Sequence, residues 1–371
     1  MTAHTQSALG GLLASLLNIA AALFLGGVLI LAVGENPFRA YAAVLEGAFG
    51  TVDGIGYTLH YATNFIFSGL GFALAAHVRQ FNIGGEGQAY FAGLIVAVLC
   101  IWLPWMPWWA LLPLAVAGAA LFGAAWAAVP AYLVVRRNCH LVITTIMFNF
   151  IASLLMIYLI VSVLRPAGSM APAGPGLEPG QRLPQIIDMI NSFGFRFQPA
   201  PLNVMIFVAL AVSYAVYRAL WRTKWGYELR AAGANDRAAR VAGVPIGRMT
   251  AQAICLSGAL VGLMAVNEIM GAQHRLTLDF ALGYGFIGIA VALIGANTPL
   301  GIVAAAVLFG ALYQGGASLV FLFPSVSREV VVVLQGLVIF FAGGLATMLR
   351  PYADALTGAL LSRSTAKTEG A

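Results

Sequence analysis

The chain has 371 residues, of which 61% are hydrophobic and 9% are charged, and its formal net charge is +6. A soluble domain usually carries about 25% charged residues, so this composition excludes an ordinary soluble enzyme or binding domain. The positive charge lies in loops beside apolar stretches, where it orients a chain in a membrane, and this argues against nucleic-acid binding.

Apolar segments that could cross a hydrocarbon core of about 30 Å recur from end to end. In chain order they are residues 9–33, 55–77, 83–101, 110–134, 141–164, 201–221, 250–270, 283–296, 300–322 and 330–349. They lack the alternation of an outer-membrane barrel. The sequence therefore predicts an all-α polytopic membrane protein with about ten transmembrane helices. The first is expected to be an uncleaved helix, because its apolar run is too long for a signal peptide.

The orientation follows from the loop that joins the sixth and seventh segments. Seven Lys or Arg residues lie between Arg218 and Arg248, and short loops rich in these residues stay in the cytoplasm. We therefore predict that residues 222–248 form a cytoplasmic loop and that both termini are cytoplasmic. The protein is expected to be a multi-pass protein of the cell (inner) membrane.

Residues 165–201 contain seven of the sixteen prolines and are predicted to be an external loop. Proline and glycine at this density prevent a regular span. The stretch LPQIIDMI within it could form a short amphipathic helix. The loop is either a connector or a docking surface for an external partner.

The stretch IGGEGQ at residues 83–88 interrupts the third apolar segment. Too few apolar residues follow it to cross the bilayer, so Glu86 and Gln88 are expected near membrane depth. Non-helical backbone there is tolerated only if it is buried in protein or lines a wet cavity, and an ionisable residue there is a pathway candidate. We predict that Asn82, Glu86 and Gln88 line a substrate path. Alternatively, the glycines only start a helix, and Glu86 caps it.

The cytoplasmic loop contains a short helix signal. Asn235 or Asp236 is a suitable N-cap, the run DRAARVA favours helix, and Gly243 followed by Pro245 ends it. The helix is either a solvated loop element or a docking helix for another protein. The candidate docking residues are Gly233, Asn235, Ala238, Ala239, Arg240 and Gly243.

Two stretches, SGLGFALA at 68–75 and SGALVGLMA at 257–265, are similar to each other. Five predicted spans separate them, so they would run in opposite directions. Inverted repeats of this kind are common in transporters. Small residues at close spacing also simply pack helices.

No catalytic residue, metal site or cofactor site is predicted. The two lysines, Lys224 and Lys367, are not preceded by glycine, so there is no P-loop. The five histidines are scattered, and the three cysteines are widely spaced. Transport driven by ATP would therefore require an ATPase on another chain.

Four stretches resemble a known family: FNIGGEGQ (81–88), ITTIMFNFIA (143–152), WGYELRAAGANDRAARVAGV (225–244) and GYGFIGIAVALIGANTPLGIVAAAVLFGAL (283–312). They are similar to the permease subunits of ABC importers in the branched-chain amino acid, ribose and nucleoside group, above all the nucleoside and simple-sugar permeases. The resemblance implies a type II-like importer fold and one transmembrane permease domain over residues 1–371. It also implies three partners: a cytosolic ABC ATPase, an extracytoplasmic substrate-binding protein and a second permease, which is either the same chain or a paralogue. The docking helix would then contact the ATPase.

The expected substrate is a nucleoside or a related small polar molecule, and a simple sugar is possible. Such molecules need stacking surfaces and hydrogen-bonding groups. Phe148, Asn149 and Phe286 could supply these, together with Asn82 and Gln88.

The main alternative is an ion-coupled secondary transporter, which shares broken helices and inverted repeats. Coupling to H⁺ or Na⁺ normally uses intramembrane carboxylates. Glu86 and Glu268 are the candidates in this sequence.

Overall fold

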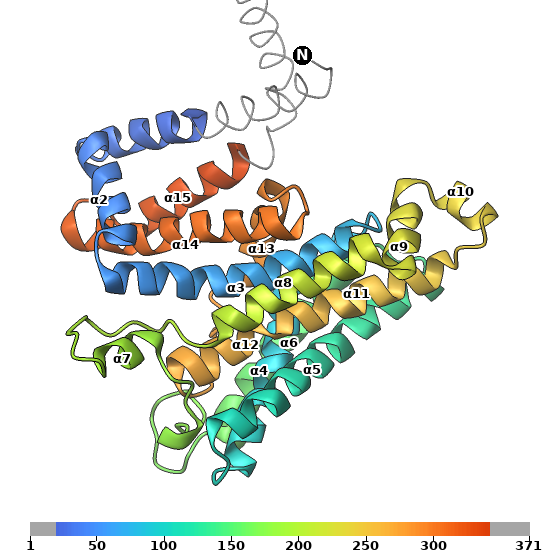
Figure 1. Ribbon diagram of the computed structural model, residues 1–371, viewed down its shortest axis with the longest axis horizontal. Coiled ribbons are helices and arrows are strands. Elements are labelled where there is room, and N and C mark those ends of the chain that lie inside the picture. Colours follow the sequence, from blue (N-terminus) through green and yellow to red (C-terminus); the bar gives the residue numbers. More distant parts are fainter. Residues whose placement is uncertain (1–19, 342–371) are drawn as a thin grey trace, which may run out of the picture. The chain divides into compact units, whose positions relative to one another are not determined.

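The computed structural model describes residues 20–341, which are helical apart from loops and two isolated β-bridges. Within the described residues the chain forms two compact units (Figure 1). We call residues 48–311 the core unit, and residues 20–47 with 312–341 the terminal unit. The expectation of one permease domain over residues 1–371 stays a prediction.

The core unit carries every predicted functional residue. Its helices are α3 (Val52–Ala76), α4 (Gly85–Trp102), α5 (Trp108–Arg137), α6 (Leu141–Tyr158), α7 (Ile186–Asn191), α8 (Met205–Arg222), α9 (Lys224–Ala234), α10 (Asp236–Val241), α11 (Ile246–Gly262), α12 (Met264–Val266) and α13 (Tyr284–Ile294). Two π-helical segments, η1 (Leu159–Leu164) and η3 (Asn267–Gln273), continue α6 and α12, and a 3₁₀ turn, η2 (Pro179–Gln181), precedes α7. The helix α14 (Pro299–Leu322) starts in this unit.

The terminal unit contains the helix Ala20–Ala32, α2 (Pro37–Phe49), the end of α14 and α15 (Arg328–Ile339). The first two helices meet at 113°. The bend is local: Gly34 has φ +91°, and the side chain of Asn36 accepts a hydrogen bond from Phe38 N at 2.9 Å, just before α2. The predicted spans 9–33 and 330–349 both extend outside the described residues.

Six helical segments of residues 20–341 are long and apolar enough to cross a membrane, and the bent pair would make seven. They are Gly85–Trp102, Trp108–Arg137, Leu141–Leu164, Met205–Arg222, Ile246–Gln273 and Pro299–Leu322. The prediction of an all-α membrane protein is confirmed, and the count of ten crossings stays a prediction. One assignment is wrong: α13 has 11 residues, which rise about 16 Å, too little to cross by itself.

Backbone contact through glycine joins α5 and α11. A Cβ atom on Gly258 would collide with Gly123 O, and one on Gly262 would lie 2.5 Å from Ala119 O. Small residues at such positions allow membrane helices to approach closely. These two helices therefore pack without a layer of side chains between their backbones.

The two similar stretches, 68–75 and 257–265, lie on α3 and on the end of α11 with the start of α12, and α3 packs against α11. A Cβ on Gly71 would lie 2.8 Å from Ser257 O, and Asn64, earlier on α3, bonds to Glu268, beyond the end of α11. The helices are therefore antiparallel, the direction that an inverted repeat requires. The repeat itself stays a prediction.

The proline-rich segment 165–201 is folded onto the core unit. Leu177, Leu183 and Ile187 are buried, and the Gln181 side chain donates to Cys100 O at 2.8 Å and Leu103 O at 2.9 Å, at the end of α4. The short helix α7 occurs where the sequence suggested one. In Figure 1, α7 lies at one end of the long helices of this unit, and α9 and α10 lie at the other.

The predicted capped helix is confirmed as α10. Asn235 Oδ1 accepts hydrogen bonds from Arg237 N and Ala238 N, both at 3.1 Å. Gly243 ends the helix at φ +82°, a left-handed conformation that glycine adopts freely. An additional helix, α9, precedes it, where the sequence indicated only loop; the Thr223 side chain caps it by accepting from Gly226 N.

Candidate functional site

The turn before α4 is stabilised by the side chain of Asn82. Its Oδ1 accepts a hydrogen bond from Gly84 N at 2.9 Å, and its Nδ2 donates to Ser257 Oγ on α11 at 2.8 Å. Gln88 lies 3.3 Å from the same amide. Both side-chain amides are buried, and their hydrogen bonds are made to other groups of the protein. The interruption at IGGEGQ is thus anchored to α11.

Asn149 on α6 binds the same interruption from the other side. Its Oδ1 accepts from Gly87 N at 3.0 Å, and its Nδ2 donates to Ile83 O at 2.9 Å. The first N–H groups of a helix have no partner within the helix, so a side-chain acceptor at this point stabilises its start. Asn149 therefore sets the position of the first turn of α4.

Glu86 lies where the first turns of α4 and α13 meet. Its Oε1 accepts a hydrogen bond from Gly285 N at 2.9 Å, and the side chain is buried. A Cβ on Gly285 would lie 2.6 Å from Glu86 N, so glycine is needed for this approach. A helix N-terminus favours a negative charge. Glu86 thus caps α13, whereas the sequence suggested a cap on the helix that starts at IGGEGQ, which is α4.

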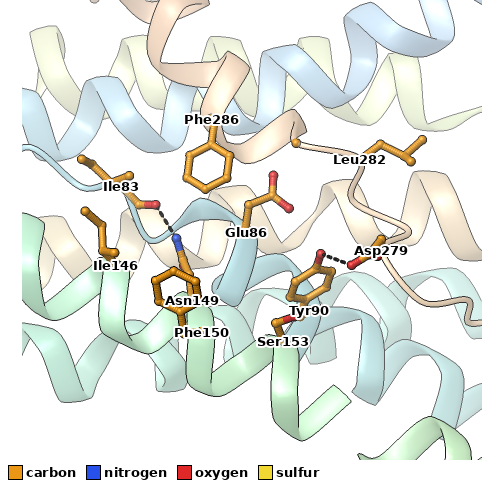
Figure 2. Close-up of a pocket in the computed structure, with 11 residues that line it drawn as sticks. Ile83, Glu86, Tyr90, Ile146, Asn149, Phe150, Ser153, Asp279, Leu282 and Phe286 are labelled. Carbon is orange, nitrogen blue, oxygen red and sulfur yellow. Dashed lines mark hydrogen bonds between the residues drawn. The ribbon is translucent and has the colours of Figure 1, made fainter. Parts of the chain in front are cut away.

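A cavity of about 540 Å³ opens beside Glu86 (Figure 2). Its walls come from the start of α4, from α6 and from the segment that leads into α13. The lining residues are Ile83, Glu86, Tyr90, Ile146, Asn149, Phe150, Ser153, Asp279, Leu282, Gly283 and Phe286.

The cavity combines aromatic rings with hydrogen-bond acceptors. Phe150 and Phe286 line it, and Tyr90 donates to Asp279 Oδ1 at 3.1 Å. It contains two carboxyl groups, and none of its eleven lining residues is Lys, Arg or His. This arrangement suits a neutral, partly aromatic and hydroxylated molecule, and it disfavours an anion.

Three of the six predicted path residues line this cavity: Glu86, Asn149 and Phe286. Asn82 and Gln88 do not: their amides bond to each other, and Asn82 also donates to Ser257. Phe148 lies edge-on to Trp126, with ring centroids 5.4 Å apart, and is not a lining residue either.

The other lining residues were not identified from the sequence, although helical periodicity indicates some of them. Ile146, Phe150 and Ser153 lie on the same helical face as Asn149, and Tyr90 lies one turn after Glu86. This periodicity could have found them once Asn149 and Glu86 were chosen. Asp279 carries no such signal, because it lies in a loop.

The predicted docking residues have different environments. Gly233 is packed against the end of α3, where a Cβ would collide with His77 O. Ala239 is buried in the chain's own fold, whereas Asn235, Ala238, Arg240 and Gly243 are exposed. Val241 is 91% exposed and was not among the candidates.

Residues 54–343 match the family described as the permease component of branched-chain amino acid transport systems, and the chain belongs to this family. It is 32% identical to the guanosine ABC transporter permease protein NupP of Bacillus subtilis, over 90% of this chain and 93% of that one. It is 31% identical to the glucose ABC transporter permease protein TsgB13 of Haloferax volcanii, over 88% and 85%. It is 30% identical to the nucleoside ABC transporter permease protein NupB of Lactococcus lactis, over 89% and 90%. No solved structure matches the chain.

The chain is therefore a multi-pass membrane permease component of an ABC transporter and is not itself a catalyst. Permeases of this family work with an ATPase and a binding protein.

Proposed function

We propose that the chain forms the translocation path of a binding-protein-dependent importer for a nucleoside or a closely related neutral molecule. The cavity beside Glu86 carries this proposal. It offers the rings of Phe150 and Phe286 for a base, and the carboxyl groups of Glu86 and Asp279 for hydroxyl or amino groups. Two of the three relatives named above are guanosine or nucleoside permeases.

A simple sugar is the second candidate. The carboxyl groups of the cavity would serve sugar hydroxyls equally well, and one relative is a glucose permease. The two aromatic rings favour the nucleoside, because a purine or pyrimidine gains more from stacking than a sugar does.

The partners and the orientation are part of the proposal. The loop 222–248 would be cytoplasmic and would contact the ATPase through α10, and the segment 165–201 would be external and would contact the binding protein. Their location at opposite ends of the long helices supports this arrangement (Figure 1). Both termini would be cytoplasmic, and a second permease, identical or paralogous, would complete the pair.

Uptake into proteoliposomes that hold the full complex tests the function. With ATP inside and no ion gradient, we expect uptake of guanosine, weaker uptake of glucose and none of guanosine monophosphate. An ATPase variant that binds ATP without hydrolysing it is the control. Uptake driven by an ion gradient without ATP would instead establish the secondary transporter.

The exposed face of α10 gives a test of the ATPase contact. Val241 is 91% exposed, so Val241→Asp should keep the fold and disrupt an apolar contact. Uptake per ATP hydrolysed should fall by about thirtyfold, since hot-spot changes cost about 2 kcal/mol. Gly243→Pro should act similarly, because proline cannot adopt φ +82°.

Uptake, ATP hydrolysis and co-purification of the ATPase should be measured together. Ala239→Glu would not test the ATPase contact, because Ala239 is buried within this chain and a carboxylate there would disturb the fold. Asp236→Asn, on the same helix, is the matched control. Normal uptake by both Val241→Asp and Gly243→Pro would show that α10 is not the contact.

A further inference from the structure

A cluster of buried polar side chains lies between α3 and η3, apart from the cavity lining. We call it the buried polar cluster; it consists of His60, Asn64, Asn267, Glu268 and Gln273. The first four are at most 4% exposed. Polar groups inside a membrane protein are costly unless they are paired, so such a cluster indicates a function beyond packing.

The carboxylate of Glu268 is the centre of this cluster. Its Oε1 accepts a hydrogen bond from Asn64 Nδ2 at 2.6 Å and lies 3.1 Å from His60 Nε2. Its Oε2 accepts from Gln273 Nε2 at 3.1 Å. The carboxylate is thus fixed to α3 on one side, and it holds Gln273 on the other.

The π-helical turn brings Glu268 and Gln273 together. They are five residues apart, and in an α-helix their side chains would point about 140° away from each other. The segment Asn267–Gln273 is π-helical, and its i to i+5 pattern aligns them. π-helical turns inside α-helices occur frequently at functional sites.

Gln273 in turn holds the segment that forms one wall of the cavity. Its Nε2 also donates to Phe280 O at 3.3 Å, and its Oε1 accepts from the Thr277 hydroxyl. The residues that follow η3 include His274, Asp279 and Leu282, which all have positive φ. Such a backbone persists only where the surrounding structure holds it.

The same segment is also bonded to the proline-rich segment 165–201. Gly174 N donates to Leu276 O, and Leu177 N donates to His274 O, both at 2.8 Å. Asp279, Leu282 and Gly283 at its far end line the cavity. Two sets of hydrogen bonds therefore fix residues 274–283. One set comes from Gln273 in the interior of the unit, and the other comes from the segment 165–201, which we expect to be external.

We propose that Glu268 and Gln273 are positioning residues that set the shape of the transport cavity. They do not touch the cavity themselves. They hold residues 274–283 so that Asp279 meets Tyr90 and Gly283 leads into α13 beside Glu86. The proposal rests on the proposed function in that it takes this cavity to be the transport path.

A reporter cysteine at position 282 tests the position of the segment directly. Leu282 lines the cavity and is 53% exposed. Leu282→Cys would be introduced after the three native cysteines are replaced by alanine, and its labelling by a small hydrophilic maleimide would be followed in membranes that contain the full complex. Glu46→Cys in the same background is the reference for an exposed residue, because Glu46 is exposed and belongs to no proposed contact. The amount of inserted protein shows whether each variant folds.

The charge pattern of the pair permits an exchange experiment. Glu268→Gln alone brings two amide groups together, and Gln273→Glu alone brings two carboxylates together. The double variant restores an amide that donates to a carboxylate. We expect each single variant to change the labelling rate at position 282 by about tenfold, the size of a lost hydrogen bond to a charged group. The double variant should recover part of this change, because a carboxylate at position 273 accepts from the amide at position 268 and from the Thr277 hydroxyl but cannot donate to Phe280 O.

Gln185→Ala is the matched control, because the Gln185 side chain has no hydrogen-bond partner within residues 20–341. If a single exchange prevents folding, Thr277→Val removes only the hydroxyl bonded to Gln273 and should change labelling in the same direction. Unchanged labelling in the folded single variants, or no recovery in the double variant, would overturn the proposal.

Uptake separates this inference from the proposed function. If the labelling rate changes while uptake does not, Glu268 and Gln273 do position the segment, but the cavity is not the transport path. If uptake falls with the labelling change and recovers in the double variant, both proposals stand.

Discussion

Glu86→Ala should lower ATP-driven uptake by at least about tenfold, whereas Glu86→Gln should keep most of it. Alanine leaves the buried Gly285 N–H at the start of α13 without the acceptor that it has at 2.9 Å. Losing a charged partner of a buried group costs about 1.5–3 kcal/mol, and here the loss also displaces a cavity wall. Glutamine retains an acceptor of nearly the same shape.

Initial uptake rates over a range of substrate concentrations would measure this effect. Glu46→Ala, which removes an exposed carboxylate, is the control. A change in substrate preference for Glu86→Gln would add a cargo contact to the capping role. Near-normal uptake by Glu86→Ala would show that neither role matters for transport.

The second large effect concerns the glycine contact of α5 with α11. Gly258→Leu should prevent accumulation of folded protein, because even a Cβ at this position collides with Gly123 O and lies 2.6 Å from Ala127 Cβ. Overpacking a close contact costs about 1–3 kcal/mol for small additions and more for large ones. Gly258→Ala should therefore insert but unfold at a lower temperature.

The amount of membrane-inserted protein and the midpoint of thermal unfolding in detergent would be compared with Gly176→Ala. A Cβ on Gly176 meets no atom within 4 Å among the described residues, so this control should match the parent. If Gly258→Leu is as abundant and as stable as the control, the two helices do not make this contact in the membrane.

The sequence predicted the helices better than it predicted their relation to the membrane. Hydrophobic length located α4, α5, α6, α8, α11 and α14 within a few residues, and cap chemistry located α10. It also located α13 within two residues, but it treated this segment as a span, and the helix between Gly283 and Gly295 has 11 residues, too few to cross by itself. It also missed α9, whose glycines obscured a helix that is capped by Thr223.

Three of the six predicted path residues line the cavity and the others do not. The two sets could not be separated in advance, because a sequence does not show the direction of a side chain. The sequence shows that Asn82, Glu86 and Gln88 lie at a helix break, but not which way each side chain points. Asn82 points toward α11 because of a tertiary contact with Ser257, and Gln88 bonds to the Asn82 amide. The wall that contains Asp279 comes from a segment about 190 residues further along the chain, and no local pattern indicates such a distant pairing.

The backbone contact between α5 and α11 also constrains how the protein is made. Gly123 and Gly258 are separated by roughly 135 residues, which a ribosome adds in about 7–27 s at about 5–20 residues per second. During that interval the small-residue face of α5 has entered the bilayer, but its partner helix has not yet been synthesised. Lipid or a membrane chaperone must cover that face until α11 arrives. An early, tight association of α5 with another helix would therefore trap the nascent chain, and slow translation between these two points would prolong the risk.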